Sequence, residues 1–274
     1  RGNHVDWFSS IESWIYVGLA LSAGWVATIH LATAREPLFH RELFADVNFV
    51  IALLFMVIVG AVMFATMALL PPMLQQLFRY DVIDTGIVLM PRGVGVLISM
   101  QLSGLLMKKG VDARWLVATG FLLGAWSLHD MTLWSLETDR WHFIATGLLQ
   151  GLGIGLVFIP LNATAFATLP PHLRTDGSSL LNLTRSVGSS VGISVVMTLL
   201  ARNLQRNHEE LSGHVTPELS TSFDLSTLDR FQQYGRAALA FADAEINRQA
   251  AMIAYLNDFE LMKWMSLAAV PMVL

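Results

Sequence analysis

Residues 147–196 read GLLQGLGIGLVFIPLNATAFATLPPHLRTDGSSLLNLTRSVGSSVGISVV, and this stretch decides the fold. It predicts two apolar helices joined by a short turn that begins at Leu169. In a bilayer, lipid tails compete for apolar surface, so helices associate where small residues let their backbones approach closely. Glycines suited to this packing recur at four-residue spacing on both predicted helices: Gly147, Gly151, Gly155, Gly188 and Gly192.

Polar residues interrupt the same two helices. An arginine inside a spanning helix costs roughly 2.5–3.5 kcal/mol on insertion scales, so it normally faces protein or a wet cavity. Arg185 and Asn182 lie one turn apart and share a helix face, and Asn162 is near the same end of the first helix. These three residues predict a polar cluster. It either ties the two helices together or contacts a substrate in a cavity.

The composition places the chain among polytopic membrane proteins. Of its residues 54% are hydrophobic and 14% are charged, and the mean hydropathy is +0.54. The net charge of −4 argues against a nucleic-acid partner, which would need a clustered basic face. Because the chain has no cysteine and its eight histidines lack ligand spacing, we expect no metal site and no cofactor.

Seven stretches are long and apolar enough for spanning helices, which need about 20 residues each. Their ranges are 11–34, 48–70, 83–107, 115–133, 141–168, 178–201 and 254–274. The chain begins without Met and ends inside an apolar run, so we expect it to be a fragment.

Lys and Arg in the short loops predict the orientation, because cytoplasmic loops carry an excess of both. One set of loops holds six of these residues and the other set holds two. We therefore expect the first set in the cytoplasm, namely Arg35, Arg41, Lys108, Lys109, Arg114 and Arg174. The long loop at about 203–253 is then external. Its helical second half either docks an external partner or rests on its own bundle as an amphipathic segment.

A short motif that occurs twice indicates an internal repeat. Arg92-Gly93-Val94-Gly95 and Arg185-Ser186-Val187-Gly188 occupy similar positions in the second helix of two consecutive triplets. The two triplets run in opposite directions by the orientation above. Inverted three-helix repeats of this kind are found in secondary transporters.

Three further positions in this interior are candidates for chemistry. Arg92 follows Pro91, a residue that should bend its helix and, with Gly93, shape its packing. Gln150 lies at a similar depth, so the two side chains can share a polar layer. Arg92 either serves an ion or substrate path or locks helices together by binding carbonyl groups. Asp258 is the candidate carboxylate for proton coupling, although it lies near a predicted helix end.

Several motifs resemble the fourteen-helix drug:proton antiporters (drug:H+ antiporter-2 family) of the major facilitator superfamily. The motifs are RTDGSSLLNLTRSVG at 174–188, QGLG at 150–153, PRG at 91–93, DWF at 6–8 and QAAMIAY at 249–255. The resemblance implies an all-α membrane protein. Residues 47–274 would form the C-terminal six-helix domain, built from two inverted three-helix repeats. Residues 1–46 would supply an external segment, one linker transmembrane helix and a cytoplasmic loop.

The resemblance also implies a function. It is proton-coupled efflux of hydrophobic or amphipathic drugs across the bacterial cytoplasmic membrane, by alternating access. The expected partners are membrane lipid, protons, the drug and the N-terminal half of the same transporter. In double-membrane bacteria a periplasmic adaptor and an outer-membrane channel join them. Export of one metabolite or siderophore is the alternative, and a membrane-embedded enzyme would need a catalytic constellation that the sequence lacks.

Overall fold

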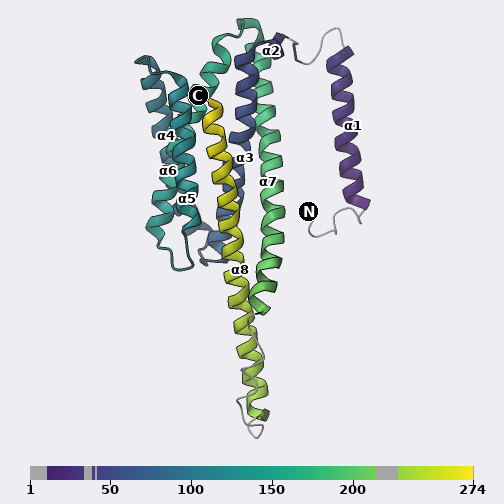
Figure 1. Cartoon of the computed structure of the whole chain (residues 1–274), viewed down its shortest axis with the longest axis vertical. Coiled ribbons are helices and arrows are strands. Elements are labelled where there is room, and N and C mark those ends of the chain that lie inside the picture. The colour runs from purple at the N-terminus through teal and green to yellow at the C-terminus, as the bar shows by residue number, and fades with distance from the viewer. Residues whose placement is uncertain (1–10, 34–38, 41, 214–227, 274) are drawn as a thin grey trace.

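The computed structural model describes residues 11–33, 39–40, 42–213 and 228–273. Its elements are α1 (Ile11–Thr33), α2 (Glu42–Ala45), α3 (Val47–Gln76), α4 (Val82–Lys108), α5 (Ala113–Thr132), α6 (Arg140–Ala167), the 3-10 turn η3 (Pro171–Leu173), α7 (Arg174–Gly213) and α8 (Leu228–Val273). Helices α3 to α8 gather side by side as one bundle, and α1 lies to one side of it (Figure 1). The all-helical fold predicted from the sequence is confirmed.

Aspartate residues fix where four of the bundle helices begin. The side chains of Asp46, Asp81, Asp112 and Asp139 each accept a hydrogen bond from a backbone N–H in the first turn of α3, α4, α5 and α6. Such N-caps satisfy donors that the helix itself leaves unpaired. The apolar residues inside these helices do not determine where each helix begins, so the aspartate N-caps do.

Asp46 also joins two helices at one end of the bundle. Its Oδ2 accepts a hydrogen bond from the hydroxyl of Thr168, the residue that follows α6. This hydrogen bond, together with those from the N–H groups of Phe49 and Asn48, lowers the pKa of Asp46.

The membrane-spanning character is unequal among the described helices. Three helices, α3, α4 and α6, and the stretch Pro171–Glu210 are long and apolar enough to cross a membrane. The described apolar core of α1, Trp14–Val26, is shorter. Helices α5 and α8 lie in the bundle but fall below the same apolar criterion over their described residues. We attribute this to charged residues within them, such as Asp130 in α5 and Glu260 in α8.

Three helices extend further than the sequence predicted. Helix α3 continues through Pro71 and Pro72 to Gln76. Helix α7 continues past Ala201 to Gly213, and α8 is one helix from Leu228. The predicted loop at 203–253 is therefore mostly helical. Beyond the other helices, α7 projects a short way and α8 continues well past the end of α7 (Figure 1). The predicted ends followed the limits of the apolar stretches, whereas the residues beyond those limits still form helix.

Candidate functional site

Arg92 lies inside the bundle on α4, with 8% of its surface exposed. Its Nη2 donates a hydrogen bond to the carbonyl oxygen of Met63 on α3, at 3.2 Å. The guanidinium therefore connects two helices that belong to the same predicted triplet. A buried arginine in such a position normally marks a protein interior or a wet pathway.

Gln150 comes to the same place from α6. It is 3% exposed, and its Oε1 has no hydrogen-bond partner among the described residues. Gln150, Met63 and the buried Ser266 of α8 line a small cavity of about 40 Å³, close to the volume of one water molecule. Met63 therefore lies beside both residues, because its carbonyl oxygen accepts the Arg92 hydrogen bond and it lines the cavity together with Gln150.

Asp258 is the most isolated charged group of the bundle interior. It is 1% exposed, and neither carboxylate oxygen has a hydrogen-bond partner in the described part of the chain. Met262 and Ser266 follow it at four-residue intervals, and both are buried. On α3, the Thr66 hydroxyl lies 3.5 Å from the sulfur of Met262. A stripe of α8 therefore leads from Asp258 to the cavity that Gln150 lines.

The sequence placed Asp258 near the end of a helix, where solvent is the default environment. The structure differs because α8 begins at Leu228, which puts Asp258 thirty residues into the helix. Burial between α8 and its neighbours follows from that continuous helix.

Arg185, Asn182 and Asn162 lie close together near Phe158. The Arg185 Nη2 donates to Asn182 Oδ1 at 2.9 Å, and its guanidinium lies 5.6 Å from the centre of the Phe158 ring. Asn162 donates from Nδ2 to the Phe158 carbonyl oxygen at 2.7 Å. Asn182 itself is exposed, and the other two polar side chains are half-buried. The cluster therefore lies at an open face of α6 and α7 and not in the core.

The predicted packing glycines lie where helices touch most closely. A Cβ on Gly151 would overlap the carbonyl oxygen of Arg92, and one on Gly155 would overlap the Ser99 hydroxyl. Gly147 faces the same helix, with its Cβ position 3.8 Å from the Arg92 Cβ. Helices α4 and α6 thus meet backbone to backbone.

The other predicted glycines do the same between α7 and α3. A Cβ on Gly188 would overlap the carbonyl of Val57, and one on Gly192 would overlap the backbone of Ala61. Gly60 of α3, which the sequence analysis did not single out, meets the carbonyl of Arg185. It was missed because the residues four positions before and after it are Met56 and Phe64, so no small residue recurs at four-residue spacing.

The sequence predicted that Gly93 packs against a neighbouring helix, and this prediction is wrong. Gly93 is exposed, and no described atom would lie within 4 Å of a Cβ there. Gly95 makes the close approach instead, against the carbonyl of Leu148. Half a turn separates the two glycines, and the helix turns only Gly95 toward α6. Pro91 is half-buried within an uninterrupted α4.

No group of three His, Asp or Glu residues gathers as metal ligands do in the ranges that the structure describes. The polar interior consists instead of single charged or amide side chains held between apolar helices. Apolar helices around isolated charged groups are typical of multi-pass membrane transporters.

Sequence comparison identifies the kind of transporter. The Major Facilitator Superfamily model matches residues 6–193, and the chain belongs to this family. It is therefore a multi-pass protein of the cytoplasmic membrane.

Curated relatives carry names that refer to drugs. The chain is 31% identical over 196 residues to the "Multidrug resistance protein B homolog" of Mycobacterium tuberculosis (strain ATCC 25618 / H37Rv), covering 71% of this chain and 36% of the relative. It is 29% identical over 222 residues to the "Multidrug export protein EmrB" of Escherichia coli (strain K12), covering 79% and 42%. For the "Probable multidrug resistance protein EmrY" of the same strain, identity is 27% over 250 residues, covering 91% and 48%. The chain spans less than half the length of these relatives.

Proposed function

We propose that the chain is the C-terminal half of a fourteen-helix drug:proton antiporter. The complete transporter exports hydrophobic or amphipathic drugs across the bacterial cytoplasmic membrane by alternating access. Residues 47–274 form its C-terminal six-helix domain, and α1 with its flanking segments in 1–46 forms a linker helix. The printed names of three relatives, each of which refers to drug resistance or export, support the substrate class.

The surface of α7 supports a missing helical domain as the partner. Asn182, Ser186 and Ser190 follow one another at four-residue spacing, and all three are exposed. The two serine hydroxyls donate to backbone carbonyls one turn earlier, which leaves a smooth, weakly polar face. Such a face suits another helix or a wet cavity better than lipid tails. We assign it to the contact with the N-terminal half, where Asn182, Asn162 and Arg185 border the drug path.

The observation that carries proton coupling is the unpaired, buried carboxylate of Asp258. An ionised carboxylate without hydrogen bonds is costly in an apolar interior, so binding a proton there is favourable. When the helices shift and admit water or a cation, the same group can release the proton. Ser266, two turns after Asp258 on α8, lines the same cavity as Gln150, and Arg92 binds Met63 at that cavity. In this proposal Gln150 and Arg92 organise the polar groups of the bundle centre.

The test uses the complete polypeptide in a drug-susceptible bacterial strain. We expect wild-type protein to confer resistance to hydrophobic drugs that collapses when a protonophore is added. Asp258→Asn should abolish this resistance while membrane abundance stays unchanged. Asp243→Asn is the matched control, because Asp243 is an exposed aspartate of the same helix.

Drug-induced proton release from energised, everted vesicles gives the second measurement. Wild type and Asp243→Asn should release protons when drug is added, and Asp258→Asn should not. If Asp258→Asn still exchanges drug for protons, Asp258 is not the coupling group. If no drug is exported by the wild type, export of one metabolite becomes the better explanation. Dependence of resistance on a periplasmic adaptor and an outer-membrane channel can be measured in the same strain by deleting each.

A further inference from the structure

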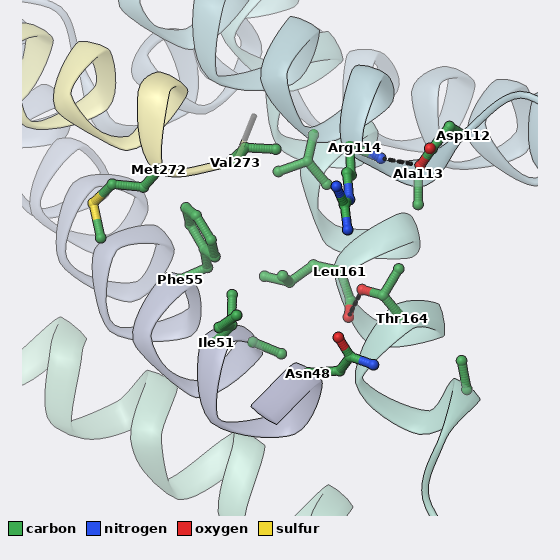
Figure 2. A pocket seen from close by; sticks show the side chains of 13 residues that line it. Asn48, Ile51, Phe55, Asp112, Ala113, Arg114, Leu161, Thr164, Met272 and Val273 are labelled. Carbon is green, nitrogen blue, oxygen red and sulfur yellow. Dashed lines mark hydrogen bonds between the residues drawn. The ribbon is translucent and has the colours of Figure 1, made fainter. Parts of the chain in front are cut away.

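A larger cavity of about 380 Å³ opens between α3, α5, α6 and α8 at the end where α3 and α5 begin (Figure 2). Pockets that hold small molecules in proteins measure roughly 300–1,000 Å³. None of the side chains described in the candidate functional site lines this cavity. It lies at the end of the bundle that carries Lys108 and Lys109.

The lining has an apolar side and a polar side. Figure 2 shows Ile51, Phe55, Leu161 and Met272 on one side of the cavity. The Arg114 guanidinium, the Asn48 amide and the Thr164 hydroxyl face it from the other side (Figure 2). An occupant that satisfies both sides has an apolar body and one polar end.

Arg114 decides the charge of that polar end. Its side chain points into the cavity and has no hydrogen bond or ion pair among the described residues (Figure 2). Asp112 also lines the cavity, but its Oδ1 accepts the backbone N–H of Arg114 at 3.0 Å as the cap of α5. Its side chain lies at the outer edge, away from the apolar side (Figure 2). The guanidinium is therefore available to a ligand, and its planar donors match a carboxylate or a phosphate.

Asn48 supplies a further donor for the same head group, and Thr164 does not. The Asn48 side chain has no hydrogen-bond partner in the part of the chain that the structure describes, so its amide can donate to an anion. The Thr164 hydroxyl already donates to the carbonyl oxygens of Pro160 and Leu161, each at 3.0 Å. Its proton is therefore engaged within α6, and Thr164 adds a polar surface but no free donor for the anion.

We propose that this cavity binds an amphipathic molecule with an acidic head group. The carboxylate or phosphate binds Arg114 and Asn48, and the apolar chain lies along Ile51, Phe55 and Leu161. A free fatty-acid-like carboxylate and the phosphate of a membrane phospholipid share this chemistry. The inference does not rest on drug transport, because it concerns binding at the end of the bundle and not passage across it.

Photolabelling tests the inference with the complete polypeptide in phosphatidylcholine vesicles. The probe is a twelve-carbon fatty acid that carries a photoreactive diazirine near the end of its chain. We expect labelled peptides from the starts of α3 and α5 and from the end of α6. Arg114→Gln should weaken labelling roughly tenfold, because a charge-assisted hydrogen bond is lost. Lys109→Gln, which removes the same charge at the same end outside the cavity, should leave labelling within about twofold.

Two controls test the head group and the cavity separately. The alcohol with the same chain and diazirine should label poorly, because it has no negative charge. Leu161→Trp fills the cavity and should prevent labelling by the acid although the protein is folded. Adding phosphatidylglycerol to the vesicles separates the sources. Competition identifies a phospholipid phosphate as the occupant, and no competition identifies a free carboxylate. Equal labelling of wild type and Arg114→Gln, equal labelling by acid and alcohol, or label spread over the outer faces of the helices would each overturn the proposal.

Discussion

The carbonyl oxygen of Arg92 on α4 occupies the space that a side chain on Gly151 of α6 would need. The carbonyl of Arg185 on α7 stands in the same relation to Gly60 of α3. Three residues later the pattern repeats, with Gly95 against the Leu148 carbonyl. Gly188 likewise lies against the carbonyl of Val57. In the predicted triplets α3–α4–α5 and α6–α7–α8, the second helix of each therefore packs against the first helix of the other. Helix α4 packs on α6 and α7 packs on α3, each through its copy of the short arginine–glycine motif.

We predict that Gly151→Ala and Gly60→Ala each destabilise the bundle. The added methyl group meets backbone, which cannot rotate away as a side chain can, and overpacking of this kind costs about 1–3 kcal/mol. The measurement is the temperature at which detergent-purified protein loses its monodisperse peak in size-exclusion chromatography.

Gly124→Ala is the matched control for both substitutions. It lies in α5, where no described atom falls within 4 Å of a Cβ. Replacing an unhindered mid-helix glycine by alanine favours the helix by up to about 1 kcal/mol, so its temperature should stay equal or rise. If Gly151→Ala behaves like Gly124→Ala, the two helices are not in backbone contact.

The sequence could predict these contacts only in part. Residue type and spacing alone predicted two features, because nothing else defines them. These are the repeated motif at 92–95 and 185–188 and the spaced glycines in 147–196. Their partners were not predicted, since the choice between Gly93 and Gly95 and the role of Gly60 depend on how each helix is rotated. Rotation is set by contacts distant in sequence, and periodicity is weak in helices that are apolar on all sides.

The stability of the bundle should also respond to Asp258. Its two carboxylate oxygens are buried without a hydrogen-bond partner among the described residues, and such groups cost free energy. Asp258→Asn has nearly the same shape and cannot ionise. We expect it to raise the unfolding temperature while it abolishes coupling, as substitutions of functional buried charges often do.

Chromatography after heating measures this effect as well. Asp243→Asn should leave the unfolding temperature unchanged, because Asp243 is exposed. A fall in temperature for Asp258→Asn would mean that the carboxylate is paired in the folded protein, contrary to the structure.

Asp46 gives a prediction about pH. Its pKa is lower in the folded protein, chiefly because of the hydrogen bond from Thr168. A carboxyl group with a lowered pKa contributes stability that is present above its unfolded value of 3.8 and is lost as the pH falls through the folded value. Asp46→Ala should therefore reduce the unfolding temperature at neutral pH, by the roughly 1 kcal/mol typical of a lost N-cap. The deficit should shrink below the folded pKa.

A double-mutant cycle checks the cause of this dependence. Thr168→Val should lower the unfolding temperature in the wild-type background at neutral pH and have little effect in the Asp46→Ala background. Equal effects of Thr168→Val in both backgrounds would show that the threonine acts on stability independently of Asp46.

Helices α7 and α8 should remain paired beyond the rest of the bundle. The Asn207 Nδ2 donates to the Ala250 carbonyl oxygen at 3.2 Å, and His208 Nε2 lies 4.0 Å from Asp243 Oδ1. The chain has no cysteine, so an engineered pair is unambiguous. We expect His208→Cys with Asp243→Cys to be joined by a short bifunctional thiol reagent. The two halves should then stay linked on a gel after cleavage at a protease site inserted within 214–227.

Arg206→Cys with Asp243→Cys is the comparison that makes this result specific. Arg206 turns to Glu210 on its own helix, 2.9 Å from Nε to Oε1, and not toward α8. It should therefore crosslink much less than the pair at 208 and 243. Equal crosslinking of both pairs would indicate two independently moving helices. Selective crosslinking would establish that α7 and α8 remain paired at these positions.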